Sequence, residues 1–477
     1  MKKTVFDIIP EHKLVSPKDP IDTVCEFKWN YPIFQMDRGE FRTCCRTPPR
    51  TVTESQLQEK GIDAFLNSDH LKQSRLDLIN GIRHSDCKTC WGLEDKGMKS
   101  PREPDQFWHF MQREGMIPRE HRSKVLDVDI MHEVLAKVTT TDHEFITAKK
   151  PYMLELSLGN TCDLKCMYCN HHYSTQWATE LIKTGEITQE QYDREFPAAA
   201  PSFEAKFWEW FDRVGRFNIH RVNIIGGEPL IIPKFYEYID IMKNNLKFLK
   251  LLPNRVRPVL CIVTNLNTPP NYFKRFMDKL ASITEVFDIE IIISMESLGD
   301  RAEYIRNGIN WDRFTSNVDE LFSRKDIKFN TGFLMTVSAL SIATTKNFVQ
   351  FATELSKKHD RPVHLKQNII NYPKWQSPMI LTPDFAKYVD DAIEYMEQHV
   401  DTMPITDDFS GRYDQYIIFL KSLSNSIRNN TSSSIQERIN FINWFNRYDK
   451  IRSLDLKKTF PEYVTFWNNC ELLSITK

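Results

Sequence analysis

Short apolar runs alternate with longer helical patterns through the middle of the chain. The apolar runs, which predict strands, cover residues 153–158, 221–225, 259–263, 289–294, 330–337 and 363–370. Apolar positions at helical spacing lie between and after these runs, at 203–214, 235–246, 272–280, 312–322, 345–359 and 385–399. Strands that alternate with helices are typical of a parallel sheet built from βαβ repeats. We therefore predict an α/β fold with a partial (β/α)6 TIM-like barrel, about two repeats short of a complete barrel.

The segments on either side of this pattern differ from it. Residues 1–150 are polar and rich in proline, with one helical stretch near 64–79, and they predict an amino-terminal loop-rich domain. Residues 151–375 contain the barrel pattern, and residues 376–477 are typical of a carboxy-terminal helical region. A chain of 477 residues is long enough for these three domains.

Composition and charge exclude several classes of protein. With 41% hydrophobic and 27% charged residues, the chain matches a globular protein rather than a disordered one. Lys and Arg total 63 against 64 for Asp and Glu, which disfavours a nucleic-acid-binding protein. No apolar stretch approaches the roughly 20 residues that cross a bilayer, and residues 1–14 lack the apolar core of a signal peptide. We expect a cytoplasmic protein with neither a membrane nor a nucleic acid as partner.

The ten cysteines fall into two groups and two single positions. In a reducing compartment, clustered thiols are metal ligands or catalysts more often than disulfides. Cys162, Cys166 and Cys169 form a Cys-x3-Cys-x2-Cys loop after the first predicted strand. Three thiolates this close can hold three corners of one [4Fe–4S] cluster, which leaves the fourth iron open to a chelating small molecule. Zinc is the alternative if His171 or His172 supplies a fourth ligand.

A glycine turn follows the second predicted strand, with the sequence Gly226-Gly227-Glu228-Pro229. Two glycines allow a ligand to approach the backbone, and Glu228 can accept a hydrogen bond from a ligand ammonium. By itself the pattern also matches an ordinary turn with a solvated carboxylate. Because the turn follows the cysteine loop in the sequence, we interpret the two motifs together.

Together the cysteine loop and this turn resemble the radical S-adenosylmethionine (SAM) superfamily, over residues 152–370. The resemblance implies that the three cysteines bind a [4Fe–4S] cluster and that SAM chelates its open iron. It implies reductive cleavage of SAM to a 5′-deoxyadenosyl radical that abstracts hydrogen from a substrate, with an electron donor such as flavodoxin or ferredoxin.

The same resemblance implies the residues that bind SAM. Gly226, Gly227 and Glu228 match the contacts to the SAM amino group, and Tyr168 matches the residue beside the adenine. Val263-Thr264-Asn265 is similar to the ending of the family's third strand, although Leu266 replaces a glycine there. A segment of the fourth strand and the helix after it is similar to the part that meets the SAM ribose and carboxylate. The implied set is Tyr168, Gly226, Gly227, Glu228, Thr264, Ser294, Glu296 and Arg306.

The first cysteine group supplies four more thiols. Cys25 and Cys44 lie at either end of a predicted hairpin that contains Gly39, and Cys87 and Cys90 form a Cys-x2-Cys turn. Four thiolates satisfy one metal centre. The Cys-x13-Gly-x4-Cys spacing resembles the start of the SPASM/twitch auxiliary-cluster module, here placed ahead of the barrel rather than after it. That resemblance implies a second [4Fe–4S] cluster; a zinc ribbon satisfies four cysteines equally well, and Cys45 is the alternative to Cys44.

The resemblance implies a substrate class but no individual substrate. Many SPASM and twitch relatives act on peptides, so we expect a peptide or protein substrate. The alternatives are a small-molecule oxidoreductase acting on a carbohydrate or cyclitol, and a non-enzymatic iron–sulfur electron-transfer protein. Possible surface anchors for a long substrate are Trp91, Trp108, Trp444 and Trp467.

Two cysteines stand outside both groups. If Thr264 points into the barrel, strand alternation turns Cys261 toward the outer helices as a core thiol. Cys470 has no predicted role.

Overall fold

The computed structural model describes residues 20–95, 100, 102, 104–113, 116–117, 127–141, 146–251, 256–399, 413–430 and 435–475. The prediction made on residues 1–14 lies outside these residues. The chain divides into a first compact unit, Met1–Gly159 with Arg194–Asn223 and Asn244–Pro258, and a second, Asn160–Asp193 with Ile224–Lys243 and Val259–Lys477. Within the described ranges, no helix is both long and apolar enough to span a membrane.

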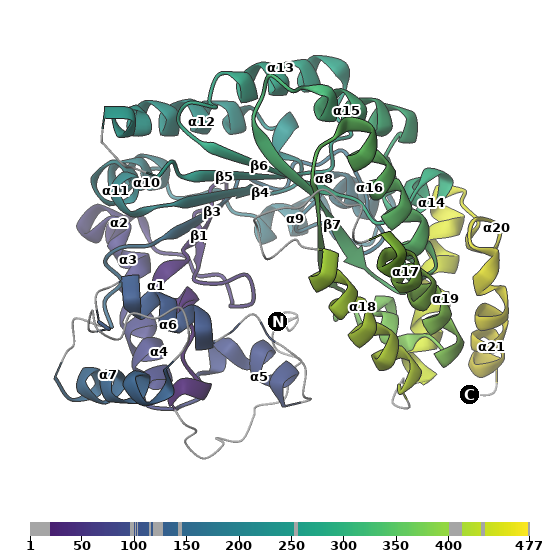
Figure 1. Ribbon diagram of the computed structural model, residues 1–477, viewed down its shortest axis with the longest axis horizontal. Coiled ribbons are helices and arrows are strands. Elements are labelled where there is room, and N and C mark those ends of the chain that lie inside the picture. The colour runs from purple at the N-terminus through teal and green to yellow at the C-terminus, as the bar shows by residue number, and fades with distance from the viewer. Residues whose placement is uncertain are drawn as a thin grey trace. The chain divides into compact units, whose positions relative to one another are not determined.

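In the part of the chain that the structure describes, eight strands form one sheet in the order β2-β1-β3-β4-β5-β6-β7-β8 (Figure 1). The strands are β1 (Ile33–Gln35), β2 (Glu40–Arg42), β3 (Met153–Ser157), β4 (Arg221–Ile225), β5 (Val259–Thr264), β6 (Asp288–Ser294), β7 (Phe329–Val337) and β8 (Val363–Ile369). The helices up to β5 are α1 (Phe27–Asn30), α2 (Glu54–Lys60), α3 (Asp63–Leu66), α4 (Asp69–Ile79), α5 (Lys88–Glu94), α6 (Pro104–Arg113), α7 (Val128–Thr141), α8 (Thr175–Lys183), α9 (Gln189–Glu195), α10 (Phe203–Trp210), α11 (Arg216–Asn218) and α12 (Pro233–Leu246). The later helices are α13 (Pro270–Ala281), α14 (Gly299–Ile305), α15 (Trp311–Ser323), α16 (Thr345–His359), α17 (Ala386–His399), α18 (Tyr413–Arg428), α19 (Ile435–Arg452), α20 (Leu456–Thr459) and α21 (Val464–Ile475).

The α/β class predicted from the hydrophobic pattern is confirmed. All six predicted strands are present as β3 to β8, and each predicted helix is present, the one at 203–214 continuing from α10 into a π-helical turn, Phe211–Gly215. After β8 the described residues are helical or irregular, as predicted for the carboxy-terminal region. The closure of a (β/α)6 barrel and the domain boundaries at 150/151 and 375/376 stay predictions.

The predicted loop-rich character of residues 1–150 is wrong, because their described part carries α1 to α7 and two strands. The predicted hairpin is confirmed as the antiparallel pair β1 and β2, and Gly39 in its turn adopts φ +63°. That hairpin also extends the sheet, because β1 pairs in parallel with β3. The two strands have three residues each, and α1, α2, α3 and α5 have four to seven, which is too short to establish a period in the sequence; α6 and α7, with 10 and 14 residues, were long enough and were missed.

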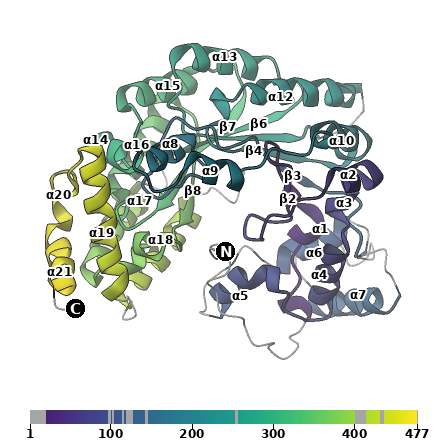
Figure 2. The ribbon, with the colours of Figure 1, turned by 180° about the vertical axis from the view of Figure 1, so that it is seen from behind.

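Within the second unit, the register of the strands determines which side chains face the helices. Thr264 pairs with Ile293, and Ile293 pairs with Phe333. The ring of Phe333 lies 5.2 Å from that of Phe348 in α16, so this face of the sheet is covered by the outer helices. Figures 1 and 2 show α13, α15 and α16 along this outer side of β5 to β8.

The orientation predicted for Cys261 is wrong. Cys261 lies an odd number of residues from Thr264 and pairs with Glu290, so both side chains lie on the opposite, inner face. Lys366 shares that face and donates to the Glu290 carboxylate at 2.5 Å. The prediction failed because it assumed that Thr264 points into the barrel. Cys261 is nevertheless buried, with 4% of its surface exposed.

Candidate functional site

The cysteine loop precedes α8 and is held by backbone hydrogen bonds on both sides of Cys166. Lys165 donates from its N–H to Asn307 O at 2.7 Å, and Met167 donates to Ile305 O at 2.7 Å. Trp177 in α8 donates from its indole Nε1 to Cys166 O at 2.9 Å. Cys166 is buried, whereas Cys162 and Cys169 are partly exposed. The loop therefore has a fixed backbone around Cys166.

The glycine turn packs directly against this loop. A Cβ atom on Gly227 would lie 2.2 Å from Thr161 O and 2.5 Å from the Thr161 carbonyl carbon, closer than real Cβ atoms approach backbone. The next residue, Glu228, donates its N–H to Thr161 O at 2.8 Å. Gly226 adopts φ +144°, which side chains disfavour. Only glycine at 227 permits this contact between the two motifs.

The Glu228 carboxylate is completely buried and accepts three hydrogen bonds. Its donors are the Thr264 hydroxyl at 2.7 Å, Asn265 N–H at 2.6 Å and Leu230 N–H at 3.1 Å. Burial raises the pKa of Glu228 to about 8, with the charge of Asp163 acting in the same direction and the three donors against it. A cation next to this carboxylate would therefore stabilise its ionised form.

The loop after β5 departs from the glycine-containing ending of the family that it resembles. Leu266 is buried and adopts φ +53°, a left-handed conformation that glycine adopts readily and leucine rarely does. Leu266 N–H donates to the Thr264 hydroxyl at 2.9 Å, and Leu266 O accepts from Asn317 Nδ2 at 3.0 Å. The backbone therefore has the turn that glycine would favour, held here by side-chain hydrogen bonds. Asn265 also donates to Asp163 of the cysteine loop at 2.9 Å.

Tyr168, Glu296 and Arg306 meet in a buried network. Arg306 donates to both Glu296 oxygens, from Nε at 3.1 Å and from Nη2 at 2.6 Å. The Tyr168 hydroxyl donates to the same carboxylate at 3.2 Å. Burial raises the pKa of Tyr168 well above its usual value, so its hydroxyl remains a donor. Ser294, at the end of β6, is partly exposed two residues before Glu296.

The residues implied for SAM thus join in two sets. The glycine turn contacts the cysteine loop and Thr264, and Tyr168 contacts Glu296 and Arg306. Both sets include residues of the cysteine loop, which is 160–174 in the second unit. Burial raises the pKa of Cys166 to about 11 and that of Cys169 to about 12, and the Arg306 charge opposes both shifts. Thiols in this setting need a cation to become thiolates, which a metal centre would supply.

The first cysteine group converges on one cavity in the first unit. Cys25, Cys44, Cys87 and Cys90 line it together with Lys28, Arg46, Arg102 and Asp86. Cys25 precedes α1, Cys44 follows β2, and the other two lie at the start of α5. Cys45 is exposed, so it is Cys44 that faces the cavity. A centre held by four thiolates is anionic. Of the neighbouring cations, Lys28 is paired with Asp86 at 3.1 Å and Arg102 with Glu94 at 2.5 Å, so they offset that charge only in part.

The spacing of the sulfurs differs from that of a zinc site. A tetrahedral zinc with bonds of about 2.3 Å to sulfur holds its sulfurs roughly 3.8 Å apart. Among the described residues, the cysteine sulfurs form no group of three that lie within 4.8 Å of one another. The thiols of both groups are therefore spread more widely than ligands of a single ion.

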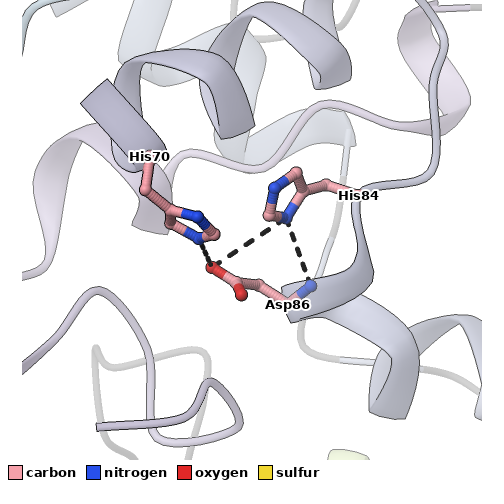
Figure 3. A group of neighbouring side chains, drawn as sticks. All are labelled: His70, His84 and Asp86. Atoms are coloured by element: carbon pink, nitrogen blue, oxygen red, sulfur yellow. Dashed lines mark hydrogen bonds and ion pairs between the residues drawn. The ribbon is translucent and has the colours of Figure 1, made fainter. Parts of the chain in front are cut away.

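His70, His84 and Asp86 form a compact group beside the first cavity (Figure 3). His70 Nε2 lies 2.9 Å from Asp86 Oδ2, and Asp86 N–H donates to His84 Nδ1 at 3.2 Å. Lys28 Nζ and Arg50 Nη2 also contact the carboxylate, at 3.1 and 3.3 Å. Burial raises the pKa of Asp86, but Lys28 and the histidines outweigh it and hold that pKa well below its usual range. The carboxylate is already compensated, so the group anchors Lys28 rather than offering a cation site.

Sequence reasoning named Arg306 but missed the other cations around the two cysteine groups, namely Lys28, Arg46, Arg102 and Arg452. Lys28 and Arg46 lie close in sequence to Cys25 and Cys44, which is the one signal that could have indicated them. Three of the four proposed surface tryptophans are wrong: Trp91, Trp108 and Trp467 are 3%, 0% and 1% exposed. Trp444 is half-buried. Cys470 is buried in α21.

Neither a protein-family profile nor a curated protein matches this chain. Solved structures that are similar include Streptococcus suis SuiB bound to S-adenosylmethionine, at 14% identity over 77% of this chain and 69% of that chain, with a TM-score of 0.36. SuiB bound to precursor peptide SuiA matches at 15% identity over 62% of this chain and 60% of that chain, with a TM-score of 0.35. TYW1 with a lysine-pyruvate adduct bound matches at 16% identity over 52% of this chain and 72% of that chain, with a TM-score of 0.27. At these TM-scores the likeness carries no argument, and the interpretation depends on this chain's own residues.

Proposed function

We propose that this chain is a radical SAM enzyme in which Cys162, Cys166 and Cys169 hold a [4Fe–4S] cluster. The observation that carries the proposal is the contact between the cysteine loop and the glycine turn, made possible by the missing side chain of Gly227. Two motifs that resemble the family separately are in contact through Glu228 N–H and Thr161 O at 2.8 Å.

Once bound, the cluster and SAM supply reductive cleavage of the C5′–S bond of SAM and the hydrogen abstraction that follows. The side chains of the chain itself would bind SAM and orient it. The buried Glu228 carboxylate compensates the SAM ammonium, with its orientation fixed by Thr264 and Asn265. Tyr168 would contact the adenine, with its ring held by the hydrogen bond from its hydroxyl to Glu296. Ser294 and the ion pair of Glu296 and Arg306 would bind the ribose and carboxylate of SAM.

The proposal includes a second [4Fe–4S] cluster held by Cys25, Cys44, Cys87 and Cys90, with Lys28, Arg46 and Arg102 lining the same cavity. The twitch-like spacing of these cysteines supports a peptide or protein as the substrate. A ferredoxin or flavodoxin is the proposed electron donor. A SAM-dependent mass change in a peptide encoded beside this chain's gene would support that class, and turnover of a carbohydrate or cyclitol instead would contradict it.

The test is SAM cleavage by anaerobically reconstituted protein with a chemical reductant. We expect 5′-deoxyadenosine, measured by mass spectrometry, from the wild type and none from the Cys162→Ala/Cys166→Ala/Cys169→Ala variant. Cys470→Ala is the matched control, because this buried cysteine in α21 belongs to neither group. Equal turnover in the triple variant would refute the assignment.

A further inference from the structure

Arg452, the last residue of α19, reaches the cysteine loop from the far end of the sequence. Its side chain is 2% exposed. Its Nη1 donates to Lys165 O at 3.0 Å and to Met167 Sδ at 3.2 Å, the residues on either side of Cys166. One guanidinium therefore spans the centre of the cysteine loop.

The guanidinium is fixed from two further directions. Glu180 in α8 accepts from Arg452 Nε at 3.2 Å and from Nη2 at 2.7 Å. The charged group also lies 4.4 Å over the ring of Trp177, the residue that donates to Cys166 O. A planar, bidentate contact of this kind has a defined geometry that lysine cannot reproduce.

The charges around this contact do not cancel. Lys165 Nζ also contacts Glu180, at 2.5 Å, so Arg452, Lys165 and Glu180 together carry a net charge of +1, and Asp163 of the same loop adds one negative charge that acts on Cys166. By contrast, the other buried arginine of the site, Arg306, pairs one to one with Glu296. Buried charges are screened by salt much less than exposed ones.

We propose that Arg452 is a positioning residue that holds the cysteine loop in its metal-binding form and makes one-electron reduction of the centre in that loop more favourable. This inference rests on the proposed function. Reduction transfers one electron from the reductant to the metal centre and changes no bond or proton. The positive charge of Arg452 favours the reduced form because that form is more negative by one charge. The carboxy-terminal helices are then part of the cysteine site.

Three variants separate the two roles. Arg452→Gln removes the contacts and lowers the local charge by one unit, whereas Arg452→Lys keeps the charge and loses the bidentate geometry. Glu180→Gln/Arg452→Gln removes the contacts but leaves +1 on Lys165, and it avoids an unpaired buried carboxylate if Arg452→Gln does not fold. Lys450→Gln is the control, because it removes one exposed positive charge from the same helix.

The readouts are the rate of iron loss to a chelator and the midpoint potential of the SAM-responsive signal in electron paramagnetic resonance. We expect faster iron loss in all three Arg452 variants. For Arg452→Gln we expect about a tenfold smaller equilibrium constant for one-electron reduction, a shift of about −59 mV. The Arg452→Lys, double and Lys450→Gln variants should keep the wild-type potential.

The outcomes are distinguishable. A wild-type protein without a SAM-responsive iron centre would overturn the proposed function, and this inference with it. A wild-type rate of iron loss and a wild-type potential in Arg452→Gln would overturn the role of Arg452 alone. If Arg452→Gln does not fold, a wild-type rate of iron loss in the double variant would overturn it. An equal fall in potential for Lys450→Gln would show a general charge effect and would also overturn it.

Discussion

Replacing Gly227 with Ala tests whether the contact between the glycine turn and the cysteine loop organises the site. The added Cβ would lie 2.2 Å from Thr161 O, 2.5 Å from Thr161 C and 2.8 Å from Asn160 C. These neighbours are backbone atoms, which cannot rotate away as a side chain could. The turn and the loop must therefore separate.

The size of that separation follows from the distances. Moving the oxygen from 2.2 Å to an ordinary contact of about 3.4 Å requires a shift of about 1.2 Å. Such a shift breaks the 2.8 Å bond from Glu228 N–H to Thr161 O. Overpacking of this kind costs about 1–3 kcal/mol of folding stability. A displacement of about 1 Å between groups that position a substrate lowers the rate about 100-fold.

The assay compares wild type and Gly227→Ala for the midpoint of urea unfolding, iron content, SAM affinity and 5′-deoxyadenosine formation. The control is Gly92→Ala, because a Cβ on Gly92 in α5 would meet nothing within 4 Å. We expect the control to be at least as stable as wild type, because alanine favours a helix over glycine, and to keep wild-type SAM cleavage, whereas Gly227→Ala should lose about 100-fold in SAM cleavage. Wild-type stability and wild-type SAM cleavage in Gly227→Ala would refute the reasoning, because the clash would then have no consequence.

Three further predictions concern other parts of the molecule. Replacing Cys25, Cys44, Cys87 and Cys90 with Ser should lower the iron content from about eight to about four atoms per chain and leave SAM cleavage detectable; metal analysis that finds zinc in the wild type would contradict the second cluster. The pKa of Glu228 is about 8 in the folded chain against an ordinary 4.5, so the folded state keeps a proton that the unfolded state loses. The free energy of unfolding of the metal-free protein should therefore fall as pH rises from about 4.5 to about 8, and Glu228→Gln should flatten that slope in urea titrations; an identical slope would exclude Glu228 as its source. Leu266→Gly should be more stable than Leu266→Ala by about 1 kcal/mol, the reverse of the usual order, because φ at Leu266 is +53°; calorimetry that finds the alanine variant more stable would show that this conformation is not strained.

The sequence alone determined the features that depend on near neighbours. Strands β3 to β8 follow from apolar runs of five to nine residues, because periodicity over one element is enough to select its secondary structure. The cysteine spacings and the glycine turn were equally readable, since each occupies one short segment. The hairpin between Cys25 and Cys44 was predicted for the same reason, with Gly39 in its turn.

The tertiary structure decided which of these groups meet and what surrounds them. Cys261 faces the inner side of the sheet because strand register and helix packing determine which face of each strand the helices cover. No local sequence pattern encodes either. Leu266 adopts a left-handed conformation because Thr264 and Asn317 hold its backbone. Arg452 reaches Lys165 across most of the length of the second unit's sequence. Burial and charge compensation depend on contacts between distant segments, so spacing along the chain could indicate the thiols but not the cations that accompany them.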